Sequence, residues 1–85
     1  MHTFKKGDRV TIFGMTMGGK FIIEGRAIVL SRCKAIDEQY RVRFLRDGKP
    51  SLGEEYDRFV DPAGQGDPDA WVRKINEKIN EARAA

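Results

Sequence analysis

The sequence predicts a mainly β fold: a compact, strongly bent sheet or barrel of about five strands, closed by a C-terminal amphipathic helix. Over roughly the first 60 residues, short apolar runs alternate with period two, which is typical of half-buried strands. Glycines stand between and within these runs, and close spacing with glycine at the corners favours a small barrel. From about residue 66 the apolar spacing becomes helical. A chain of 85 residues is expected to form one domain, with the barrel over residues 1–62 and the helix over 67–84.

The alternation places the strands at residues 8–13, 21–30, 40–45, 52–56 and 59–60. Gly25 interrupts the second run and predicts a bend or bulge there. Asp47-Gly48 separates the third run from the fourth and is a strong signal of a tight hairpin. Residues 14–19 hold three glycines, so we expect a flexible loop that carries Met15 and Met17 at its tip.

The helix has a clear start and one apolar stripe. Asp67 is placed to cap the N-terminus, with Pro68 at the first helical position. The stripe consists of Trp71, Val72, Ile75, Ile79 and Ala82. Because an isolated helix of this length is marginal in water, the stripe must dock on another surface. Its own barrel is the default expectation, and a second copy of the chain, giving a homodimer, is the alternative.

Composition limits the setting in which the protein works. One cysteine, Cys33, excludes an intramolecular disulfide and favours a reducing compartment. No apolar run approaches the roughly 18 residues of a membrane span. The charged start, with Lys5, Lys6 and Asp8, does not resemble a signal peptide. We therefore expect a cytoplasmic protein with no membrane partner.

Three segments together resemble the opening of SH3-like small barrels. They are Phe4-Lys5-Lys6-Gly7-Asp8-Arg9-Val10, Glu24-Gly25-Arg26-Ala27-Ile28-Val29 and Tyr40-Arg41-Val42-Arg43-Phe44. A Gly-Asp-x-Val opening followed by a Gly-x-x-x-Val strand is similar to KOW-type, Tudor-like and type II dihydrofolate reductase barrels. The resemblance covers residues 4–60 and implies a fold more than a function.

The families that share this opening imply different sites. Type II dihydrofolate reductases use a Val-Gln-Ile-Tyr strand, which the corresponding region Ser51–Phe59 lacks, and Glu54 and Glu55 would repel a phosphorylated cofactor. Reductase activity is therefore only a remote alternative. Tudor-like domains use an aromatic cage for methylated cations. Tyr40, Tyr56 and Phe59 would be its rings here, although burial in the core is the commoner fate of such residues.

The residues offer little for catalysis, so we expect no enzyme, no cofactor and no metal. His2 is the only histidine and lies at a weakly tethered end of the chain. Cys33 lies between Arg32 and Lys34, which favour a thiolate, but no further histidine is present to act as its base. The carboxylates at positions 54, 55 and 57 fit a solvated strand edge better than a metal site.

Two functions remain, and a protein-interaction module is preferred to a nucleic-acid-binding module. The candidate protein-binding residues are Met15 and Met17, which make an adaptable apolar tip, and Glu54, Glu55 and Tyr56. The candidate nucleic-acid-binding residues are Lys5, Lys6, Arg9, Arg41 and Arg43. They lie in the basic half: residues 1–50 hold eleven Lys/Arg against five Asp/Glu, whereas residues 51–85 hold five against eight.

Overall fold

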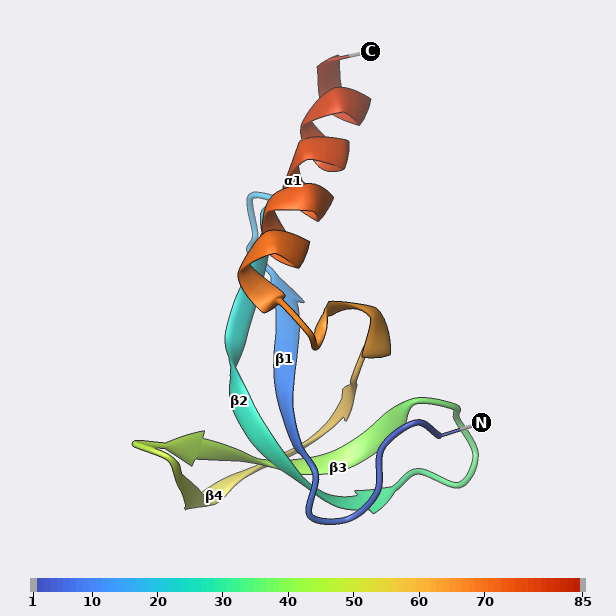
Figure 1. Ribbon diagram of the computed structural model, residues 1–85, viewed down its shortest axis with the longest axis vertical. Helices are drawn as coiled ribbons and strands as arrows, with labels where there is room; N and C mark the ends of the chain where they lie inside the picture. Colours follow the sequence, from blue (N-terminus) through green and yellow to red (C-terminus); the bar gives the residue numbers. More distant parts are fainter. Residues whose placement is uncertain (1, 85) are drawn as a thin grey trace.

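The computed structural model describes residues 2–84 and contains one antiparallel sheet and one long helix (Figure 1). In chain order the elements are β1 (Arg9–Met15), β2 (Phe21–Arg32), β3 (Gln39–Arg46), β4 (Lys49–Phe59), the short 3-10 helix η1 (Pro62–Gly64) and α1 (Pro68–Ala84). The strands follow one another as a meander in the order β1-β2-β3-β4. The predicted class, mainly β with a C-terminal helix, is confirmed.

The strand count is four and not about five. The two strands predicted at residues 52–56 and 59–60 belong to the single strand β4, which starts directly after the hairpin turn. β1 continues through Gly14 to Met15, which pairs with Phe21, so Met15 lies in a strand and not in the predicted loop. The loop itself is confined to residues 16–20, because the ladder between β1 and β2 extends further than the glycines suggested.

The sheet bends along β2. The first part of this strand pairs with β1 and the last part pairs with β3. The register with β1 shifts between Ile12 and Phe13, where Gly25 and Ile23 are the partners and Glu24 is left over as the extra residue of a bulge. The predicted irregularity at Gly25 is thus present. As a result, the β1–β2 hairpin points toward α1, and the β3–β4 hairpin runs across the direction of the β1–β2 hairpin (Figure 1).

The turn between β3 and β4 follows the sequence signal. Asp47 and Gly48 have φ values of 52° and 77°. Two successive positive φ values define the type I′ turn whose twist matches that of a hairpin, and Asp-Gly tolerates them at low cost.

The core lies on the inner face of the bent sheet. Its buried side chains are Val10, Ile12, Ala27, Val29, Tyr40, Val42, Phe44 and Val60. They come from β1, β2, β3 and the residue that follows β4, and Phe4 packs against them from the N-terminal arm. A thin core of this kind leaves many strand side chains partly exposed.

The helix starts as predicted. The amide of Ala70 donates to the Asp67 carboxylate at 3.2 Å, so Asp67 caps it. The helix docks on its own sheet, but none of its described residues is fully buried, and Ala82 of the predicted stripe is exposed. Near its C-terminal end, Arg83 donates to the carbonyl of Gly18 at 2.8 Å. No helix over residues 2–84 is long and apolar enough to cross a membrane.

Candidate functional site on the β3–β4 ribbon

Cross-strand ion pairs cover one face of the β3–β4 ribbon, which we define as residues 39–59. The Arg41 guanidinium lies 3.4 Å from the Asp57 carboxylate, and Arg43 lies opposite Glu55 and pairs with it. The predicted basic residues of β3 and the predicted acidic residues of β4 are therefore partners on a single surface. Much of the positive charge that β3 would offer to a polyanion is balanced within the sheet.

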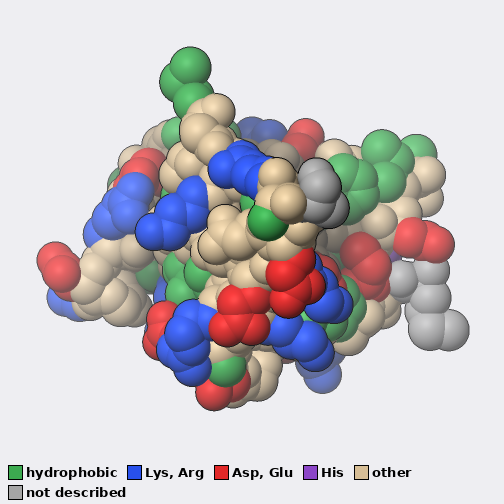
Figure 2. Space-filling view, turned by 90° about the horizontal axis from the view of Figure 1, so that it is seen from above, with side chains coloured by type: hydrophobic (Ala, Val, Ile, Leu, Met, Phe, Trp, Pro, Cys, Tyr) green, Lys and Arg blue, Asp and Glu red, His purple; other side chains and the backbone are tan. Residues whose placement is uncertain are grey.

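A further pair lies near the hairpin turn. Arg46 donates to the carboxylate of Glu54, and this bond holds the pKa of Glu54 below its ordinary value and raises the pKa of Arg46. With these three arginine–carboxylate pairs, the ribbon presents a mixed surface with little net charge. Figure 2 views the molecule from above, from the side of α1, and acidic and basic side chains are interleaved there as well.

The aromatic rings of the ribbon are covered by the protein's own arginines. Phe44 and Tyr56 meet edge to face with centroids 5.8 Å apart. The guanidinium of Arg58 lies 5.5 Å from the centre of the Tyr56 ring and that of Arg46 lies 5.9 Å from the centre of Phe44. The face of Tyr56 that a methylated cation would need is thus already in contact with a cation.

The other two rings of the expected cage lie elsewhere. Tyr40 is buried in the core, where its hydroxyl accepts a bond from the amide of Phe4 at 2.9 Å. Phe59 is 62% exposed at the end of β4. Within residues 2–84, no ring contact links Tyr56 to either of them. The three rings therefore do not assemble into a cage.

β4 is an edge strand with unusually exposed apolar side chains. Between the pairs Arg43–Glu55 and Leu45–Pro50 its register shifts, so residues 51–54 form a bulge. Leu52 projects from this bulge with 86% of its surface exposed. Tyr56 and Phe59 are also exposed, and within residues 2–84 β4 pairs with β3 alone. The outer edge of β4 thus combines unpaired backbone groups with apolar side chains.

Elsewhere the protein caps its strand edges with side-chain amides. Gln65 accepts from the amide of Thr11 at 2.7 Å and donates to the carbonyl of the same residue at 3.0 Å. Asn76 makes the same pair of bonds to Phe21, at 2.8 and 2.9 Å. Each side chain replaces the hydrogen bonds that a neighbouring strand would make. Sequence reasoning missed both, because a glutamine in a linker and an asparagine on a helix carry no local signal of this role.

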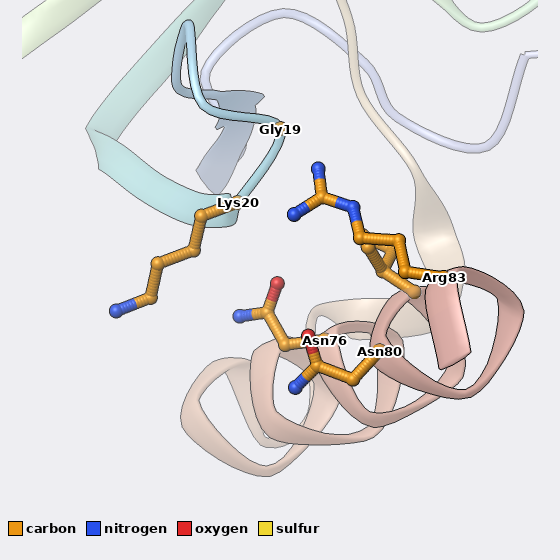
Figure 3. Close-up of a pocket in the computed structure, with 6 residues that line it drawn as sticks. Gly19, Lys20, Asn76, Asn80 and Arg83 are labelled. Carbon is orange, nitrogen blue, oxygen red and sulfur yellow. The ribbon is translucent and has the colours of Figure 1, made fainter.

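Met15 ends β1 and Met17 lies in the β1–β2 connection. Figure 1 shows this connection beside α1, at the other end of the molecule from the β3–β4 hairpin. Met17 is fully exposed and Met15 is more than half exposed. The predicted protein-binding residues are therefore split between two surfaces. Beside this tip, a hollow is lined by residues of the connection and of α1, and the side chains of Asn76 and Arg83 point into it (Figure 3). Both side chains already bond to the backbone of residues 18–21, so the residues that line this hollow attach the helix to the β1–β2 connection.

The N-terminal arm is better anchored than its position suggested. The Nε2–H of His2 donates to the carbonyl of Cys33 at 2.7 Å, and its Nδ1 accepts from the amide of Glu38 at 3.3 Å. The Glu38 carboxylate accepts bonds from the Thr3 amide and the Tyr40 hydroxyl. His2 therefore acts in this structure as a tether, with both ring nitrogens engaged.

Over residues 2–84, no group of three or more histidine, cysteine or carboxylate side chains is placed to hold a metal ion. Cys33 is a free, partly buried thiol whose neighbour His2 bonds to its carbonyl.

Comparison of the chain with protein-family models, curated proteins and solved structures finds no match in any of the three. The resemblance to SH3-like barrels therefore stays a prediction.

Proposed function

We propose that this protein is a non-catalytic interaction module that binds an extended segment of a partner protein along the free edge of β4. One observation carries the proposal: the edges at Thr11 and Phe21 are capped by side-chain amides, whereas the edge of β4 has no such cap among the described residues. An open edge is a template for adding one more strand. Strand addition to an exposed edge is a common way for proteins to bind peptides.

The chemistry of the edge favours an apolar, extended partner segment. Main-chain hydrogen bonds would supply part of the affinity, and Leu52, Tyr56 and Phe59 offer apolar contacts beside them. The carboxylates of Glu55 and Asp57 already face arginines, so the ribbon has little charge left to recruit a strongly charged segment. A segment rich in β-branched and aromatic residues fits these conditions best.

The experiment compares peptide binding at two exposed apolar sites, the edge of β4 and the β1–β2 connection. A displayed peptide library is selected on the wild-type protein, and the affinity of the best peptide is measured by calorimetry for Leu52→Lys, Phe59→Lys and, as the matched control, Met17→Lys. All three side chains are exposed, so the variants should fold, which circular dichroism checks. We expect each β4 variant to bind about tenfold more weakly, since a buried contact is lost and a lysine protects the edge, and the control to bind normally.

Three outcomes would overturn the proposal. Loss of binding in Met17→Lys alone would place the contact at the β1–β2 tip. Failure of the wild-type protein to select any peptide family would remove the strand-addition site. A wild-type dimer in light scattering that Leu52→Lys or Phe59→Lys dissociates would show that a second copy of the chain occupies the edge.

The second candidate, nucleic-acid binding, depends on the basic residues that the sheet does not neutralise. The side chains of Lys5, Lys6 and Arg9 form no ion pair with a carboxylate among residues 2–84, in contrast to Arg41 and Arg43. Fluorescence polarisation of labelled DNA and RNA tests this candidate. Binding that falls steeply with salt and is lost in Lys5→Gln/Lys6→Gln would favour it, and an unchanged signal at low salt would reject it.

A further inference from the structure

The outer face of the sheet contains a hollow of about 390 Å³, lined by Arg9, Arg26, Leu45 and Gly48. We refer to it as the arginine hollow. In the ladder between β1 and β2, Arg9 lies opposite Ile28 and Arg26 lies opposite Thr11. The two arginines are therefore diagonal neighbours on the same face, with Cβ atoms separated by about 7 Å. Both arginines line the same hollow.

The charges of the arginine hollow are not balanced by the protein. Of the five other strand arginines, four each have a carboxylate within salt-bridge distance, namely Arg41, Arg43, Arg46 and Arg58, and Arg32 has none among the described residues. Arg9 and Arg26 have none among residues 2–84, and no acidic side chain lines the hollow. Two like charges held side by side on a sheet repel each other, and an anion between them removes that repulsion.

The remaining lining adds a donor and an apolar wall. Gly48 is the second central residue of the hairpin turn, and its amide takes part in no hydrogen bond among the described residues. A Cβ atom at this position would meet nothing within 4 Å, so the backbone there is open to approach. Leu45 supplies the apolar side of the hollow.

We propose that the arginine hollow binds the phosphoryl group of a compact ligand. Each guanidinium presents a fork of N–H donors that matches a phosphate, and two positive charges match a phosphate dianion better than a carboxylate. The volume lies at the small end of the range for ligand sites. On the adjacent strand β3, Arg41 and Arg43 are neutralised, so the basic surface of the hollow does not continue across this strand for a long polyanion.

The test is an amide ¹H–¹⁵N titration of the full chain with inorganic phosphate and with pyrophosphate, against sodium chloride at equal ionic strength. We expect saturable shifts at Arg9, Arg26 and Gly48 with the phosphates only. Arg26→Gln should weaken pyrophosphate binding at least about tenfold, and Arg26→Lys should also weaken it because the fork is lost. Arg73→Gln removes the same charge from an exposed helix residue that forms no ion pair within residues 2–84, and it should leave pyrophosphate binding unchanged. The amide spectrum of each variant reports whether it is folded.

Each alternative result overturns the proposal. Shifts of equal size with chloride would indicate ionic strength alone. Equal weakening in Arg26→Gln and Arg73→Gln would indicate attraction by net charge. A short oligonucleotide that binds more tightly than pyrophosphate and loses this advantage in Lys5→Gln/Lys6→Gln would mean that a nucleic-acid backbone, and not a compact ligand, supplies the phosphate.

Discussion

Gly64 shows how tightly one residue can control the attachment of the helix. It is buried in η1, and a Cβ atom built on it would lie 2.3 Å from Cδ1 of Trp71 and 2.7 Å from Cζ of Phe13. Gly64→Ala should therefore force two aromatic rings apart and lower the free energy of unfolding by about 1–3 kcal/mol, measured by urea denaturation. Gly66→Ala is the control, because a Cβ there meets nothing within 4 Å. An equal effect of both substitutions would contradict the close packing around Gly64.

Tyr40 gives a prediction on pH. Burial of its ring raises the pKa of the hydroxyl above its ordinary value, and the nearby Glu38 carboxylate adds to the shift. Above about pH 10 the unfolded chain loses this proton before the folded protein does, so the folded state holds more protons and its stability falls as the pH rises. We expect urea midpoints to decrease between about pH 9 and 11, and to decrease less in Tyr40→Phe. An identical decrease in both proteins would contradict the assignment.

The side-chain caps act on the scale of whole elements. Asn76 alone supplies both hydrogen bonds to Phe21 and joins α1 to the edge of β2. Asn76→Ala should lower the free energy of unfolding by about 1–3 kcal/mol because an amide and a carbonyl lose their partners. Asn80 is exposed on the same helix, and its side chain makes no hydrogen bond among the described residues. Asn80→Ala therefore raises the helix propensity by the same amount without removing a cap, and serves as the control. Equal unfolding midpoints for the two variants would mean that the cap does not hold the helix.

The elements also differ in how well the sequence predicts them. The helix start at Asp67, the Asp47-Gly48 turn and the irregularity at Gly25 were predictable because each depends on neighbouring residues. The boundaries of β4 were not, because the bulge at residues 51–54 is defined only by pairing with β3. The position of Met15 in a strand likewise depends on its partner Phe21.

The candidate site was predictable only in part. The residues of the ribbon were identified as two separate sets, one basic and one acidic, and only the strand register makes them partners. The exposure of Leu52 follows from the bulge, and the caps at Gln65 and Asn76 depend on contacts between residues 54 or 55 positions apart in the chain. Local patterns hold no information on contacts at such separations.

At the scale of the whole molecule, the arrangement is a bent sheet whose edges are capped at Thr11 and Phe21, whereas the outer edge of β4 has no such cap among residues 2–84. Figure 1 shows α1 at one end, beside the β1–β2 connection, and the β3–β4 hairpin at the other. The helix therefore leaves the ribbon uncovered. If the open edge of β4 is the functional surface, the free protein must keep it accessible and not close it by strand pairing or self-association.

Amide hydrogen exchange of the free protein, followed residue by residue by NMR, tests this claim most directly. We expect Thr11 and Phe21, whose amides donate to the caps, to be protected, and alternate amides between Glu55 and Phe59 to exchange much faster. Protection of every amide in that segment, as strong as in β3, would mean that the edge of β4 is already covered. That result would contradict the proposed binding of a partner segment at this strand.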